Sequence, residues 1–143
     1  MVRIAVLVSG GGTNLQALIA ARAGIPGYVV ARKDFASNRE MTIALVDKLR
    51  ELNIGLVVLA GFLHILTGEM VAAFPNAILN VHPALIPSFC GAGYYGLHVH
   101  EAALAYGVKL TGATVHFVNE EPDGGPIVLQ KAAYPSPGRL PVL

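Results

Sequence analysis

The sequence has 143 residues, of which 54% are hydrophobic and 13% are charged, and its formal net charge at neutral pH is +1. A chain of this length can form one domain with a buried core, and so small a net charge argues against a nucleic-acid backbone as partner. The single cysteine, Cys90, excludes an intramolecular disulfide, and the apolar run at residues 4–8 is too short for a signal-peptide core or a membrane span, so we expect a cytoplasmic protein without a membrane partner.

The first half of the chain alternates predicted strands and helices. Residues 4–8 form a continuous apolar run ended by a glycine-rich turn, which predicts a strand buried on both faces. A helix is predicted over residues 14–23, and the helical spacing of apolar side chains predicts another over 39–52. Further strands are predicted at residues 28–31, 56–60 and 77–80, with a brief helix around 69–73. Such alternation is typical of a parallel sheet covered by helices.

The pattern changes after residue 80. Proline and glycine mark a long loop, a helix is predicted over residues 99–106, and a glycine-rich turn joins strands predicted at 110–118 and 127–134. The last two strands are typical of an antiparallel hairpin at the edge of a sheet. We therefore predict one α/β domain over residues 1–143: a Rossmann-like, mostly parallel sheet with helices on both faces and an antiparallel C-terminal strand pair.

The glycine-rich turn at residues 9–14 is the first candidate site. A turn between a strand and a helix directs backbone N–H groups and the helix dipole at one place, which suits a phosphate. A tight turn that binds nothing explains the same pattern. The turn is not a dinucleotide fingerprint, because Leu15 occupies the third glycine position, and it is not a P-loop, because no Gly-Lys-Ser/Thr follows.

Asn80 and His82 form the second candidate site, at the end of a predicted strand, where open parallel sheets place their ligands. Alternation puts the two side chains on one side of the strand, so an amide and an imidazole could together hold a developing oxyanion. The structural alternative is an asparagine that ends a strand and a histidine bonded to the backbone. Asp123, in Glu-Pro-Asp-Gly-Gly, is by itself an ordinary turn aspartate.

The other histidines are interpreted as structural. His98 and His100 stand two residues apart before a helix, with no carboxylate or cysteine at ligand spacing, so no metal site is predicted. His116 lies beside Thr114 in a predicted strand and is interpreted as a sheet histidine with satisfied hydrogen bonds. His64 is flanked by apolar residues and could belong to a pocket wall or to the surface.

Five segments taken in order carry a family resemblance: VLVSGGGTNLQALI, LVVLAGFLHIL, ILNVHPALIPSF, GLHVHEAALAYGVKLTGATVHFV and EEPDGGPIVLQ. Together they resemble the formyltransferase family over nearly the whole chain, and the SGGGTNLQ opening resembles its glycinamide ribonucleotide branch. The resemblance implies the formyltransferase fold. It also implies transfer of a formyl group from 10-formyltetrahydrofolate to the amine of glycinamide ribonucleotide in purine biosynthesis, by a monomer or homodimer that needs no metal.

The resemblance further implies roles for individual residues. Asn80 and a cationic His82 would stabilise the oxyanion that forms when the amine attacks directly, while Asp123 keeps His82 cationic and helps to move a proton. The residues expected to bind the substrate phosphate are Gly12, Thr13 and Asn14. The residues expected to bind the reduced folate are Leu63, His64, Ile65, Leu66, Asn80, Asn119, Glu120, Glu121, Pro122 and Asp123.

The chain departs from the family in its length. The start of one helix reads as if joined to the end of another, so a βα segment of about 25 residues is expected to be missing near residues 20–22, together with the C-terminal helices. Two other functions stay open: a formyltetrahydrofolate deformylase, in which water replaces the amine, and a catalytically inactive phosphate-binding or folate-binding module.

Overall fold

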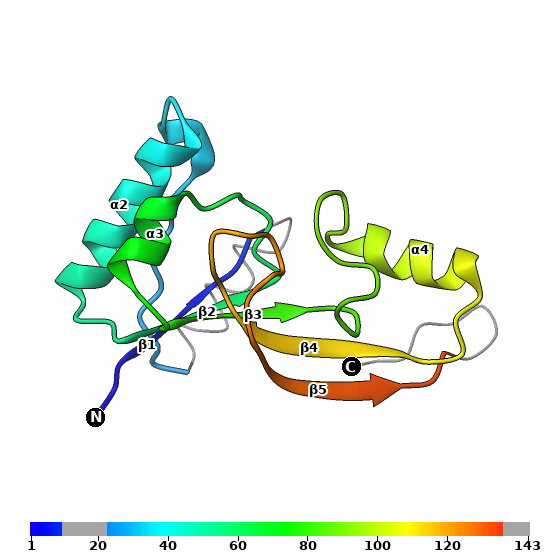
Figure 1. Ribbon diagram of the computed structural model, residues 1–143. Helices are drawn as coiled ribbons and strands as arrows, with labels where there is room; N and C mark the ends of the chain where they lie inside the picture. The colour runs from blue at the N-terminus through cyan, green and yellow to red at the C-terminus, as the bar shows by residue number, and fades with distance from the viewer. Residues whose placement is uncertain (10–22, 136–143) are drawn as a thin grey trace.

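The computed structural model describes residues 1–9 and 23–135 of the chain, and Figure 1 shows them as a sheet with helices beside it. The five strands lie in chain order: β1 (Ile4–Leu7), β2 (Leu56–Ala60), β3 (Ile78–His82), β4 (Thr111–Phe117) and β5 (Ile127–Ala133). The pairs β1–β2 and β2–β3 are parallel, whereas β3–β4 and β4–β5 are antiparallel. The predicted fold class is confirmed, as a parallel half extended by an antiparallel C-terminal pair.

The helices follow from local signals in the sequence. The elements are the short 3-10 helix η1 (Arg32–Asp34) and the α-helices α2 (Asn38–Glu51), α3 (Gly68–Ala73) and α4 (Leu97–Tyr106). α2 begins where the Ser37 hydroxyl accepts a hydrogen bond from the Glu40 N–H at 3.1 Å, a typical N-terminal cap. Figure 1 shows α2 and α3 side by side over one face of the parallel strands.

The core lies between these two helices and the parallel strands. Its buried members are Val46, Leu49, Val57, Leu59, Met70, Phe74 and Ile78. Ile78 contributes to this core from the start of β3, and alternation places Asn80 and His82 further along the same face. The apolar core therefore leads directly into a polar cluster at the carboxyl end of β3.

Two of the predicted strands differ from the structure. Residues 28–31 belong to no strand, and Tyr28 and Val29 are exposed, because no described strand pairs with this segment to satisfy its backbone. β1 is not buried on both faces: Ile4 and Val6 are 57% and 59% exposed, while Ala5 and Leu7 pack against the core. β1 pairs on one side only, with β2, which makes it an outer strand of the described sheet.

The other predicted elements agree with the structure to within one or two residues at most ends. The helix predicted over 14–23 lies almost wholly outside the described residues, as does the expected junction near 20–22. In the two described stretches of chain, no helix is long and apolar enough to cross a membrane.

Candidate functional site

Side chains from two adjacent strands meet where β3 ends. The antiparallel register places His116 of β4 opposite Asn80, and Thr114 opposite His82. The Asn80 Nδ2 atom lies 3.2 Å from His116 Nε2. Cross-strand partners lie on the same face of a sheet, so the amide and both imidazole rings share one face.

Asp123 reaches this cluster from the connection between β4 and β5. Its φ of 55° is left-handed, a conformation that aspartate tolerates better than most residues. The Asp123 Oδ2 atom lies 3.6 Å from His82 Nδ1, and Oδ1 lies 3.5 Å from His116 Nε2. The structure thus brings Asn80, His82 and Asp123 together, with the carboxylate between two imidazole rings; their chemical roles remain predictions.

The ring of His82 is enclosed and has a partner at each nitrogen. Only 4% of its side chain is exposed. Its Nε2 lies 2.8 Å from the carbonyl oxygen of Phe89, and its Nδ1 faces Asp123. Since both partners are acceptors, both N–H groups of an imidazolium ring would be satisfied here.

The loop after β3 supplies backbone groups to this site and is anchored to the antiparallel strands. The Thr114 hydroxyl donates to the Ala84 carbonyl at 2.7 Å and accepts from the Ile86 N–H at 3.1 Å. The Gln130 amide donates to the Ile86 carbonyl at 3.0 Å. Further along the same loop, the Gly91 N–H donates to Asp123 Oδ2 at 2.9 Å. Together with the bond between Phe89 and His82, these hydrogen bonds hold the loop against the antiparallel strands and against Asp123.

Asp123 and His116 perturb one another. Burial raises the pKa of Asp123, but hydrogen bonds from His116 and the Gly91 N–H, with the charges of both histidines, outweigh it and leave the pKa below its usual value. Burial lowers the pKa of His116, but hydrogen bonds to Asp123 and to the Phe117 carbonyl, with the Asp123 charge, leave the pKa above its usual value. The charged forms of both groups are therefore favoured in the folded protein.

These shifts predict how stability depends on pH. Asp123 stabilises the fold above its ordinary pKa of 3.8, and this contribution is lost as pH falls through its lower folded pKa. His116 stabilises the fold below its ordinary pKa of 6.5, and this contribution is lost as pH rises through its higher folded pKa. Both contributions are present between pH 3.8 and pH 6.5. We expect the free energy of unfolding to fall at pH values below and above this range, by at most about 1.4 kcal/mol per pH unit for each group. Urea unfolding at a series of pH values measures this, and a stability that rises steadily above pH 6.5 would contradict the His116 assignment.

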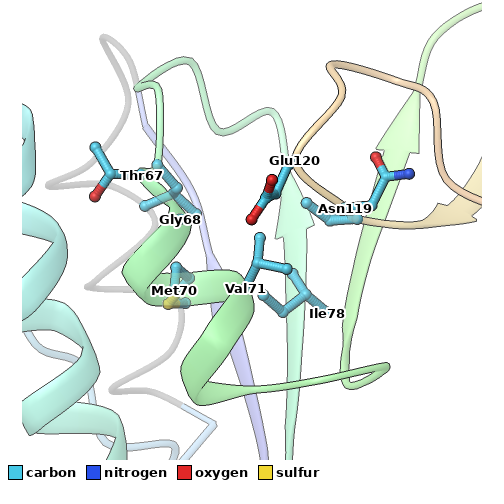
Figure 2. A pocket seen from close by; sticks show the side chains of 9 residues that line it. Thr67, Gly68, Met70, Val71, Ile78, Asn119 and Glu120 are labelled. Carbon is cyan, nitrogen blue, oxygen red and sulfur yellow. The ribbon is translucent and has the colours of Figure 1, made fainter.

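A pocket of about 360 Å³ lies between α3, the start of β3 and the end of β4. Its lining residues are Leu66, Thr67, Gly68, Met70, Val71, Ile78, Val118, Asn119 and Glu120. Figure 2 shows the Glu120 carboxylate reaching toward α3 above an apolar floor that includes Val71 and Ile78. Ile78 stands two residues before Asn80 on the same face of β3, so the pocket and the polar cluster are adjacent.

The predicted folate-binding residues divide into two groups in the structure. Leu66, Asn119 and Glu120 line the pocket. Those outside its lining are Leu63, His64, Ile65, Asn80, Glu121, Pro122 and Asp123. Leu63 and Ile65 are 50% and 74% exposed on the segment that leads to the pocket from β2. The predicted phosphate-binding residues, Gly12, Thr13 and Asn14, lie outside the described residues.

Three groups in the cluster are not among the predicted site residues: the His116 ring and the backbone groups of Phe89 and Gly91. The expectation that His116 is a sheet histidine with satisfied hydrogen bonds is confirmed, since it lies in β4 with a partner at each ring nitrogen. Its contacts with Asn80 and Asp123 are what the sequence pattern does not show. Pairing β4 with β3 would have revealed it, because that register places residue 116 opposite residue 80. No side-chain signal could have identified Phe89 and Gly91, since they act through a carbonyl and an N–H.

His98 and His100 do not join the cluster. His98 is on the surface of α4, where its Nδ1 lies 3.4 Å from Glu101 Oε2 and its side chain is 63% exposed. Across residues 1–9 and 23–135, no three His, Cys, Asp or Glu side chains are grouped in a way that could hold a metal ion.

Gly125 is required for the turn that presents Asp123. A Cβ atom at residue 125 would overlap the carbonyl group of Phe117, which is backbone and cannot move aside as a side chain would. The Phe117 N–H also donates to the Pro126 carbonyl at 2.9 Å, which ties the turn to the end of β4. We expect Gly125→Ala to destabilise the fold by about 1–3 kcal/mol, as overpacking typically does, and to displace Asp123.

The matched control is Gly27→Ala, because a Cβ atom at residue 27 would meet nothing within 4 Å. Urea unfolding of both variants tests the loss of stability. Binding of the expected ligand, a reduced folate, to both variants tests the displacement of Asp123. Equal stability of the two variants would show that the turn accommodates a side chain at residue 125.

The sequence of this chain is similar to those of known proteins. A family model described as formyl transferase matches residues 19–134. The phosphoribosylglycinamide formyltransferase of Haemophilus influenzae is 41% identical over 157 residues, which include 91% of this chain and 72% of that protein. The human trifunctional purine biosynthetic protein adenosine-3 is also 41% identical, but this chain spans only 15% of its length.

Solved structures give the same result. The crystal structure of glycinamide ribonucleotide transformylase 1 from Symbiobacterium toebii has a TM-score of 0.84 and 37% identity, covering 96% of this chain and 76% of that one. A family match over more than half of the chain, and a relative of 41% identity covered over 72% of its length, leave one conclusion. The chain belongs to the formyl transferase family, beside the phosphoribosylglycinamide formyltransferases.

Proposed function

We propose that this protein transfers a formyl group from 10-formyltetrahydrofolate to the amine of glycinamide ribonucleotide. The observation that carries the proposal is that Asn80, His82 and Asp123 form one cluster next to a pocket. Asp123 lies within ion-pair distance of both His82 and His116, and Asn80 lies within hydrogen-bond distance of His116. The names of the relatives point to glycinamide ribonucleotide and a formyl group, the family resemblance implies the folate donor, and the cluster supplies groups suited to the chemistry.

The reaction requires a negative oxygen to be stabilised. The substrate amine forms a bond to the formyl carbon, which gives a tetrahedral intermediate with a negatively charged oxygen. The intermediate collapses by breaking the bond between that carbon and N10 of the folate, and N10 takes up the proton that the amine loses. An amide N–H of Asn80 would donate to the oxygen, and a charged His82 would stabilise it electrostatically.

The position of the His82 ring restricts the ways in which it could stabilise the oxyanion. Its Nε2 already donates to the Phe89 carbonyl, and the ring is almost fully enclosed. A direct hydrogen bond from His82 to the oxyanion would require Nε2 to leave Phe89. In the described geometry a protonated His82 would therefore act through its positive charge, with the Asp123 carboxylate 3.6 Å from Nδ1.

The pocket has the character expected of a site for the ring system of a reduced folate. Its floor is apolar, from Met70, Val71, Ile78 and Val118, while the carboxylate of Glu120 is a hydrogen-bond acceptor. A flat ring with donors along one edge would find apolar walls and a carboxylate partner there. The formyl group would then face Asn80, two residues beyond Ile78 on the same face.

The missing βα segment is part of the same proposal. The alignment with the Haemophilus protein is 157 residues long but uses only 91% of this 143-residue chain, or about 130 residues, so about 27 of its positions are unfilled here. This supports a deletion of the size of one βα unit, which we place near residues 20–22. The outer position of β1 and the exposure of Ile4 and Val6 also fit the loss of a neighbouring strand.

One assay separates the three possible functions. The protein is incubated with 10-formyltetrahydrofolate in the presence and absence of glycinamide ribonucleotide, and the folate product and free formate are quantified separately. Folate product that depends on the ribonucleotide supports transfer, whereas formate released without it supports a deformylase. Folate binding by calorimetry with turnover at background would identify a binding module.

A further inference from the structure

His116 has a ring orientation that is determined by the backbone. Its Nδ1 lies 2.9 Å from the Phe117 carbonyl oxygen, which can only accept a hydrogen bond. The proton of the neutral ring is therefore placed on Nδ1, and Nε2 is left with a lone pair. Because residue 116 is only 2% exposed, bulk solvent does not reach the ring.

Nε2 faces one hydrogen-bond donor and one hydrogen-bond acceptor. Asn80 Nδ2, at 3.2 Å, is a donor and needs the lone pair of a neutral ring. Asp123 Oδ1, at 3.5 Å, is an acceptor and needs the N–H of a charged ring. Nε2 can serve only one of these partners at a time.

We propose that His116 is a positioning residue that controls the Asn80 amide. The proposal rests on the function proposed above, in which Asn80 donates to the oxyanion. When His116 is neutral, it accepts one N–H of Asn80 and so directs the second N–H of the amide away from β4, toward the substrate. When His116 is protonated, it binds Asp123 instead and releases the amide.

The surroundings of His116 determine which of its two forms is favoured. The charged or titratable groups that face it are Asp123, from the β4–β5 connection, and His82, from β3 across the same carboxylate. Among the residues that the structure describes, Asp123 is the only carboxylate within ion-pair distance of the ring. Its charge and hydrogen bond hold the pKa of His116 above the usual value despite burial. The proposal therefore predicts that turnover falls as pH drops and His116 takes up its second proton.

The first experiment needs no variant of uncertain stability. Nitrogen-15 NMR of the histidine rings of the whole protein distinguishes a ring nitrogen with a lone pair from one with a hydrogen. We expect His116 to show a protonated Nδ1 and an unprotonated Nε2 at alkaline pH, and to protonate at Nε2 as pH falls. A neutral ring with its proton on Nε2 would overturn the proposal, because it could not accept from Asn80.

The second experiment links that state to turnover. His116→Phe keeps a ring but can neither accept from Asn80 nor bind Asp123, and we expect kcat to fall about tenfold or more with little change in KM for the folate. His116→Gln offers an uncharged acceptor, so it should retain more activity than the Phe variant and should lose the decline at acid pH. His98→Phe is the matched control on the exposed face of α4.

The outcomes separate the two proposals. If wild-type protein transfers no formyl group at any pH, the proposed function fails, while the NMR result still decides how His116 and Asn80 are paired. If wild-type protein is active and both His116 variants keep its kcat within about twofold and its acid decline, His116 has no positioning role.

Discussion

Asp123→Asn is expected to lower kcat about 100-fold or more, with only a modest change in KM for either substrate. Asparagine keeps the size of the side chain and can still accept from the Gly91 N–H. It removes the negative charge that lies 3.6 Å from His82 and 3.5 Å from His116. A protonated His82 ring would then lose its opposite charge, and the proposed route for the amine proton would lose its carboxylate. Since charge develops in the transition state, the effect should fall on kcat.

The measurement for Asp123→Asn is steady-state formyl transfer, with urea unfolding to verify the fold. Asp47→Asn, on the exposed side of α2, is the matched control for the change of charge. Turnover equal to that of wild type would remove Asp123 from the mechanism. A large rise in KM at constant kcat would mean that Asp123 holds a substrate in its ground state.

His82→Ala is expected to have the second large effect, again a fall in kcat of about 100-fold or more. The variant removes the positive charge beside Asn80 and leaves the Phe89 carbonyl and Asp123 Oδ2 without that ring. Because the side chain is enclosed, some loss of stability should accompany the loss of activity.

His82→Asn separates the two effects, because it refills part of the space without restoring the charge. The variant should recover stability but not turnover. His98→Ala, at an exposed histidine, should leave both unchanged. Near-normal turnover in a well-folded His82→Ala protein would discredit the proposed role of His82 in stabilising the oxyanion.

Local and periodic signals in the sequence predict its regular elements best. The apolar spacing over residues 39–52 predicted α2 within one residue at each end, because a buried face repeating at helical intervals admits no other regular structure. The apolar run at 56–60 predicted β2 in full. The strand predicted at 28–31 was wrong, since β-branched residues favour a strand only where a neighbouring strand pairs with them.

The sequence by itself determined the α/β class, most of the helices and strands, and the placement of Asn80 and His82 on one face at the end of a strand. Those properties depend on neighbours within a few residues, which periodicity records. Only the tertiary structure decided that Asp123 lies between His82 and His116, that Phe89 and Gly91 contribute backbone groups, and that His116 shares its Nε2 between two partners. These contacts join residues from 7 to 41 positions apart and depend on strand register and on the left-handed backbone of Asp123, neither of which the local pattern of residues specifies.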